Sequence, residues 1–69
     1  MDTKKVGQFL KDQRIAKKLN HAQLAEELDF SKRNIWRIEA GEPVRLKTYL
    51  KILGYFGYTL QVTKINDER

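Results

Sequence analysis

Residues 20–41 constrain the fold of this chain more than any other stretch, because two short amphipathic helices can be read there with almost nothing between them. Apolar residues recur at helical spacing in two runs, and each run follows a polar residue suited to an N-cap. The first run, after Asn20, predicts a helix over 21–28. The second, after Ser31, predicts a helix that continues to about Ala40. Two helices joined by so short a turn form a rigid pair that organises the rest of a small domain.

Further elements are predicted on either side of this pair. The helical period predicts a helix over residues 3–18 and another over 45–56. From residue 58 the period changes to two, and β-branched and aromatic residues dominate, so a strand is predicted over 58–65. Residues 66–69 form a polar tail that is expected to fray. The side chains expected to face the core are Val6, Phe9, Leu10, Ala16, Ala22, Leu24, Ala25, Leu28, Ile35, Ile38, Leu46, Tyr49, Leu50, Leu53 and Phe56.

The predicted fold class is all-α, with four to five helices and one C-terminal strand. A chain of 69 residues makes one domain with a modest core. Residues 1–57 are expected to form that domain. A lone strand leaves its backbone N–H and C=O groups without partners. The simplest resolution is pairing of residues 58–65 with the same strand of a second copy, which predicts a homodimer.

The composition excludes several classes of function. The chain has no Cys, and its single His cannot supply the ligands of a structural zinc site, so no metal or cofactor is expected. With no Cys and no carboxylate evident beside the His, no catalytic triad can be assembled, and an enzyme is not expected. No apolar run is long enough to span a bilayer, and no signal peptide is evident, so a cytoplasmic, nucleoid-associated protein without a membrane partner is expected.

The outer side of the second helix of the pair is basic. The spacing of Lys32, Arg33 and Arg37 places them on one side of that helix, opposite Ile35 and Ile38. An ordinary solvated helix face is the plain alternative for such a cluster. The net charge of +5 favours a polyanionic partner. A rigid helix pair that presents a basic helix is typical of a helix-turn-helix domain that binds double-stranded DNA.

The stretch 19–41 closely resembles the Xre/Cro-type helix-turn-helix family, whose members carry a pattern like Leu-Thr-Gln-x-x-Leu-Ala-x-x-Leu-Gly-Val-Ser-x-x-x-Ile-x-x-Ile-Glu-x-Gly. The positions that match at the same spacing are Leu19, Leu24, Ala25, Leu28, Ser31, Ile35, Ile38, Glu39 and Gly41. The chain departs from the pattern where Asn20 and His21 replace the usual Thr and Gln, and where Asp29 replaces the usual turn Gly. The resemblance implies a domain of the lambda-repressor type.

The resemblance also implies which side chains read DNA bases. Positions 32, 33 and 37 are those that reach base edges in the major groove, and Arg and Lys there favour guanine. For Asn34, base reading and phosphate contact both stay open. Trp36 has two alternatives: packing in the core, or contact with a sugar or a thymine methyl group at the groove edge.

Contacts to the DNA backbone are implied for a second set of residues. At the N-terminus of the 21–28 helix, free N–H groups favour an anion, so His21 is expected to contact a phosphate, whereas simple capping explains Asn20 equally well. Arg14 and Glu39 match a family ion pair that ties the first helix to the third. The expected backbone contacts are Asn20, His21, Ser31, Trp36, Lys17, Lys18, Arg45 and Lys47.

The remainder of the chain, from Gly41 to Val62, resembles the subgroup that includes the DNA-binding antitoxin of HipA-type kinase toxin–antitoxin modules. Members dimerise partly through a C-terminal strand. The dimerisation residues implied here are Phe56, Tyr58, Leu60 and Val62. The expected function is a homodimeric transcriptional repressor on a palindromic operator, acting as the autoregulating antitoxin of a HipA-like kinase toxin. A stand-alone repressor without a toxin, and a protein-interaction module that does not bind DNA, stay open as alternatives.

Overall fold

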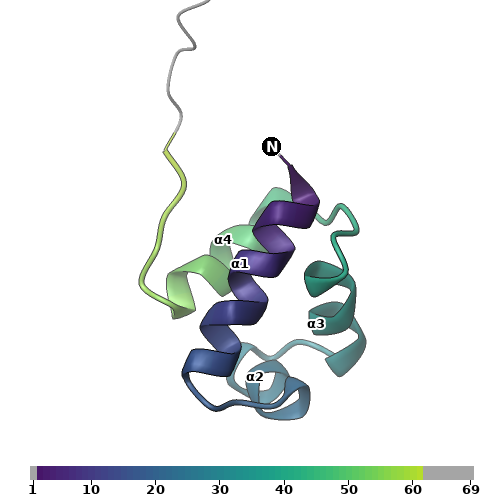
Figure 1. Ribbon diagram of the computed structural model, residues 1–69, viewed down its shortest axis with the longest axis vertical. Helices are drawn as coiled ribbons and strands as arrows, with labels where there is room; N and C mark the ends of the chain where they lie inside the picture. Colours follow the sequence, from purple (N-terminus) through teal and green to yellow (C-terminus); the bar gives the residue numbers. More distant parts are fainter. Residues whose placement is uncertain (1, 62–69) are drawn as a thin grey trace, which may run out of the picture.

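The computed structural model describes residues 2–61, which form four helices. These are α1 (Thr3–Ala16), α2 (His21–Leu28), α3 (Lys32–Glu39) and α4 (Leu46–Tyr55). Figure 1 shows α1 crossing the front of the molecule, with α3 to one side, α2 at the base and α4 farther back. After α4 the chain turns and runs up the side of the molecule that lies away from α3. The described part is therefore all-helical, as the sequence predicts.

Capping side chains explain where the helices begin. The side chain of Asn20 accepts a hydrogen bond from the backbone N–H of Gln23 at 2.7 Å, and the Gln23 side chain accepts one from the Asn20 N–H at 2.8 Å. Ser31 Oγ accepts from the Asn34 N–H at 3.1 Å and starts α3. Asp2 caps α1 in the same manner. These caps use N–H groups that a helix start otherwise leaves without partners.

The turn between α2 and α3 is held by one residue in the left-handed conformation. Asp29 has φ +56° and ψ +39°, a region that Asp and Asn adopt more readily than other residues with a side chain. The N–H of Phe30 then donates to the carbonyl oxygen of Ala25 at 2.8 Å. The half-buried Phe30 ring packs against the core. This short turn thereby fixes the orientation of α3 relative to α2.

Helices α1 and α3 approach each other closely at Gly7 on α1. A Cβ atom at this position would meet the carbonyl oxygens of Ile38 and Glu39, at the end of α3. Nearby, Thr3 Oγ1 donates a hydrogen bond to the Gly41 carbonyl oxygen at 2.7 Å. Gly7, which has no side chain, therefore lets α1 lie directly against the C-terminus of α3.

The core is assembled from all four helices. Its buried side chains are Leu10, Leu24, Ala25, Leu28, Ile35, Ile38, Tyr49, Ile52 and Leu53. The prediction was wrong for five side chains that are exposed: Phe9, Ala16, Ala22, Leu46 and Leu50. It also missed Ile52, which lies at the edge of the predicted apolar stripe of α4, beside Tyr49, and is buried. Sequence spacing identifies an apolar stripe but does not fix which edge of a wide stripe meets the neighbouring helices.

The first helix and the C-terminal strand differ from their predictions, while α4 differs from the predicted range of 45–56 by only one residue at each end. The first helix was expected to reach residue 18 but ends at Ala16, because Lys18 has φ +58° and turns the chain toward α2. The predicted strand over 58–65 is not present in residues 58–61, which have no regular structure in the single chain. Val62 and the rest of that segment lie outside the described residues, as do residues 66–69.

Candidate nucleic-acid interface

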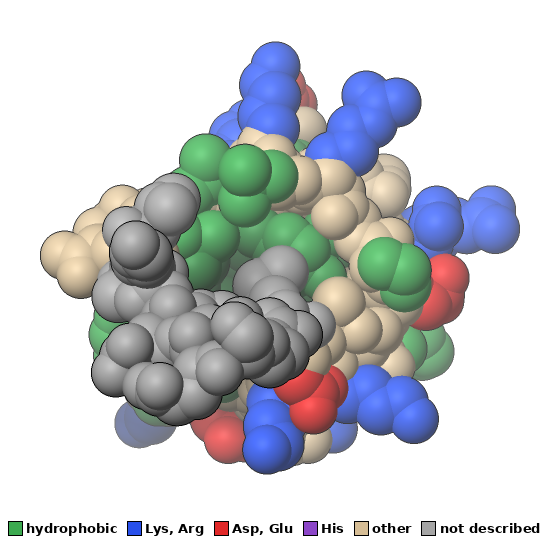
Figure 2. Space-filling model, turned by 90° about the horizontal axis from the view of Figure 1, so that it is seen from above, with side chains coloured by type: hydrophobic (Ala, Val, Ile, Leu, Met, Phe, Trp, Pro, Cys, Tyr) green, Lys and Arg blue, Asp and Glu red, His purple; other side chains and the backbone are tan. Residues whose placement is uncertain are grey.

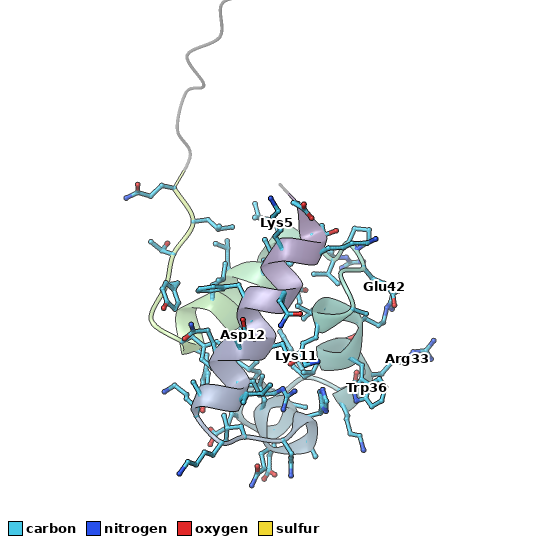
Figure 3. The ribbon with its side chains drawn as sticks, in the orientation of Figure 1. Lys5, Lys11, Asp12, Arg33, Trp36 and Glu42 are labelled. Carbon is cyan, nitrogen blue, oxygen red and sulfur yellow. The ribbon has the colours of Figure 1, made fainter. Side chains whose placement is uncertain are left out.

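The outer side of α3 is formed entirely by exposed polar, basic and aromatic side chains. Ile35 and Ile38 are fully buried and anchor the helix. The exposed residues of α3 are Lys32, Arg33, Asn34, Trp36 and Arg37. Figure 3 shows Arg33 and Trp36 projecting from α3 away from the helical body. The structure therefore brings together on one surface the residues that the resemblance assigns to base reading.

Arg37 has a partner that sequence reasoning missed. Its Nε atom donates to Oε1 of Glu42 at 3.2 Å, and both side chains are about half exposed. Glu42 lies just after α3, in the segment that leads to α4. The contact leaves the other nitrogen atoms of the guanidinium group available to a ligand. A surface pair of this kind contributes little to stability.

Arg14 and Glu39 form a bidentate ion pair beneath the helix pair. Arg14 Nε lies 2.7 Å from Glu39 Oε2, and Arg14 Nη2 lies 3.2 Å from Oε1. Arg14 Nη1 also donates to the carbonyl oxygen of Leu19 at 2.8 Å. Both charged side chains are almost fully buried. One arginine of α1 thus fixes the end of α3 and the segment that leads into α2.

His21 occupies a different environment from the one expected. The sequence offered no obvious carboxylate beside it, but His21 Nε2 lies 3.1 Å from Glu39 Oε1. Its ring also packs against the indole of Trp36, with ring centroids 5.2 Å apart and planes tilted by 39°. The contact joins the first residue of α2 to α3, 18 positions away. No periodicity within a single helix could reveal it.

Trp36 does not pack in the core. Its side chain is 59% exposed, which excludes the first of the two alternatives for this residue. A shallow apolar hollow of about 290 Å³ lies beside it and is lined by Lys32, Arg33 and Trp36. An exposed indole between two cationic side chains is available to a ligand.

Apart from His21 and Trp36, the expected backbone contacts divide into two groups. The side-chain oxygen atoms of Asn20 and Ser31 are already used as helix caps. The basic residues Lys17, Lys18, Arg45 and Lys47 are exposed at the end of α1 and the start of α4. Lys17 Nζ lies 5.5 Å from the ring centroid of Tyr55, on the side of the molecule formed by α1 and α4.

A groove between α3 and the start of α4 continues the basic surface. It has a volume of about 640 Å³ and is lined by Asn34, Arg37, Pro43, Val44, Arg45 and Thr48. No side chain caps α4, so N–H groups at its start are available to an anion. Sequence reasoning assigned neither Thr48 nor Pro43 to a contact surface, although both line this groove.

Basic side chains are not confined to α3. Figure 2 shows Lys and Arg side chains projecting around much of the outline of the molecule seen from above, with hydrophobic side chains nearer the middle. Net charge alone therefore does not mark a binding surface. The feature that makes α3 a candidate is the combination of cations, an amide and an exposed indole on one short helix.

A separate apolar groove lies between α1 and the segment after α4. It has a volume of about 330 Å³ and is lined by Lys5, Val6, Phe9, Leu53, Tyr58, Thr59 and Leu60. The rings of Phe9 and Tyr58 meet edge to face, with centroids 4.9 Å apart. Of the expected dimerisation residues, Tyr58 and Leu60 are exposed, Phe56 is half-buried, and Val62 lies outside the described residues.

No helix within residues 2–61 combines the length and the hydropathy that crossing a membrane requires. Within the same residues no cluster of three potential metal ligands is found.

Comparison with protein families agrees with this geometry. A family model described as "Helix-turn-helix domain" matches residues 5–59, which include all four helices except the first residues of α1. No curated protein gives a significant match to the chain. Domains of this family are of a DNA-binding, non-enzymatic kind, and α2 and α3 form the helix pair from which the family takes its description. The chain belongs to the helix-turn-helix domain family.

Proposed function

We propose that this protein is a sequence-specific transcriptional repressor of the Xre/Cro type, which binds a palindromic operator as a homodimer. The observation that carries the proposal is the division of α3 into two sides. Two fully buried isoleucines hold the helix, and every other residue from Lys32 to Arg37 is exposed. A helix that needed only to be soluble would not require cations, an amide and an indole together on its outer side.

In this proposal α3 lies in the major groove. Lys32, Arg33 and Arg37 donate hydrogen bonds to base edges, chiefly to guanine O6 and N7. Asn34 lies at the edge of the groove shared with Arg45, where a phosphate is its more fitting partner. Phosphate contacts from the basic residues at the ends of α1 and α4 supply the affinity that does not depend on sequence.

The homodimer would place two copies of α3 in successive major grooves, about 34 Å apart. The apolar groove that contains Phe9, Tyr58 and Leu60 supports a dimer, because these large side chains are exposed in the single chain. Leu46 and Leu50 of α4 are exposed as well. Sedimentation of the purified protein tests this part of the proposal. A single chain at concentrations that saturate an operator would overturn it.

Selection of bound fragments from random duplex DNA, followed by mobility-shift assays, tests the readout. Arg33→Ala and Arg37→Ala should each weaken binding of the selected duplex by roughly 5-fold to 150-fold, corresponding to about 1–3 kcal/mol per base contact. Lys11→Ala is the matched control, since it removes the same charge from an exposed position of α1 that is assigned neither to DNA contact nor to the groove proposed for the dimer. Unchanged affinity in both α3 variants would refute base reading by α3.

The finer role as the autoregulating antitoxin of a HipA-like kinase toxin is part of the proposal. Its support is the resemblance of the segment from Gly41 onward, which contains α4. Copurification of the protein with a kinase encoded beside its gene would support that role. Operator binding without any such partner would instead favour a stand-alone repressor.

A further inference from the structure

Trp36 is an exposed aromatic residue that the core does not need. On α3 it lies four residues after Lys32 and three after Arg33, so the three side chains share one side of the helix. The apolar hollow of about 290 Å³ is lined by these three residues. Exposure of a large apolar side chain among cations costs solvation free energy, and such groups are typical of binding surfaces.

The indole is also held in place from behind. The His21 ring packs against it from α2, at 5.2 Å between centroids. His21 Nε2 is in turn 3.1 Å from Glu39 Oε1, and Glu39 is fixed by the buried guanidinium of Arg14. This series of contacts runs from α1 through α3 to α2 and back to α3. It restricts the orientation of the indole before any ligand is present, which reduces the entropy lost on binding.

We propose that Trp36, supported by His21, is the reading surface for the C5-methyl group of a pyrimidine in the major groove. The inference rests on the proposed function, because α3 must lie in the major groove for the contact to form. The methyl group of thymine is the apolar feature that the major-groove edge of the base pairs presents. Lys32 and Arg33 are cations that line the same hollow. Their charge favours a polyanion over an apolar protein as the partner of this surface.

The geometry favours a base methyl over a deoxyribose. On a helical projection of about 100° per residue, Trp36 lies between Lys32 and Arg33 rather than beyond either of them. A side chain between two base-reading residues faces the floor of the groove. A residue that contacts sugar would lie at the edge of the exposed side instead.

Replacement of thymine by uracil, one position at a time, tests the inference. The exchange removes only the C5-methyl group and keeps every hydrogen-bonding atom of the base pair. The duplex is the one selected by the wild-type protein, and affinity is measured by fluorescence anisotropy of labelled DNA at a fixed salt concentration. At one position of each half-site, uracil should weaken binding by about fourfold, the effect of burying one methyl-sized group.

Variants of the protein identify the residue responsible. Trp36→Ala should bind the thymine and uracil duplexes with equal affinity. It should bind both more weakly than the wild-type protein does. Because Trp36 lies outside the core, this variant is expected to fold, and Trp36→Gln serves as a second form of the same change. His21→Ala should reduce the thymine-to-uracil ratio without removing it, which marks His21 as a positioning residue. Arg37→Ala should weaken both duplexes and leave the ratio unchanged.

The outcomes separate the inference from the proposed function. If selection yields no duplex that the protein binds, the proposed function fails, and the inference fails with it. If the duplex binds and no uracil position weakens binding, the methyl contact is wrong while the proposed function stands. A ratio that survives in both Trp36 variants would likewise overturn the assignment.

Discussion

Replacement of Arg14 by alanine should cost this domain a large part of its stability. The change removes a guanidinium group that is almost fully buried, together with its hydrogen bond to the Leu19 carbonyl oxygen. It leaves the Glu39 carboxylate, whose side chain is only 6% exposed, with His21 as its remaining charged or polar partner among the described side chains. An uncompensated buried charge is far more costly than the intact pair is stabilising.

The expected loss is about 3–5 kcal/mol in the free energy of unfolding. At roughly 0.05–0.15 kcal/mol per residue, a domain of this length has a total stability of about 3–10 kcal/mol. With a total stability at the lower end of this range, Arg14→Ala would be partly or wholly unfolded at room temperature. Where it still folds, Tm should fall by about 12 °C or more, since each kcal/mol shifts Tm by about 4–8 °C in a domain of this size.

Urea unfolding followed by far-UV circular dichroism measures the effect. Arg37→Ala is the matched control, because Arg37 and Glu42 form an exposed pair whose loss should change stability by less than about 0.5 kcal/mol. The double variant Arg14→Met with Glu39→Leu should recover most of the loss, because it removes both charges and keeps the volume. A loss below about 1 kcal/mol in Arg14→Ala, or no recovery in the double variant, would refute the reasoning.

Two further substitutions should differ in their effect on stability, as measured by thermal unfolding. Gly7→Ala should destabilise the fold by about 1–3 kcal/mol, because the added Cβ would meet the carbonyl oxygens of Ile38 and Glu39. These are backbone atoms and cannot rotate away. An increase in Tm would contradict this prediction. Tyr49→Phe should leave Tm unchanged or raise it by an amount equivalent to about 1 kcal/mol, since the buried Tyr49 hydroxyl has no hydrogen-bond partner within the part of the chain that the structure describes. A clear loss of stability in this variant would show that the hydroxyl does have a partner.

The helix pair could be predicted from sequence because its limits are set by local chemistry. Asn20 and Ser31 are caps whose bonds reach only three residues ahead, so the sequence contains both partners. The predicted range of 21–28 agrees with α2 residue for residue. Which side chains of a helix are buried by its neighbours was harder to predict. Leu46 and Leu50 follow the helical period as well as Tyr49 and Leu53 do, and only the position of the neighbouring helices decides that they stay exposed.

The basic residues of the candidate interface could be predicted from the sequence, but the contacts between its side chains could not. Trp36 falls between Lys32 and Arg33 on a helical projection, so its exposure could have been read from the sequence. The contacts of His21 with Glu39 and Trp36 could not, because they depend on how the start of α2 meets α3 in space. The Arg37–Glu42 contact likewise depends on the path of the chain after α3.

The single tryptophan of this chain lies outside its hydrophobic interior, so its intrinsic fluorescence reports on the surface of α3. Indole emission responds to local polarity, so its wavelength in the native state should already resemble that of a water-exposed fluorophore. Unfolding would shift it only slightly. A blue shift on adding a macromolecule would instead show, without any label, that water has been excluded from the exposed side of α3.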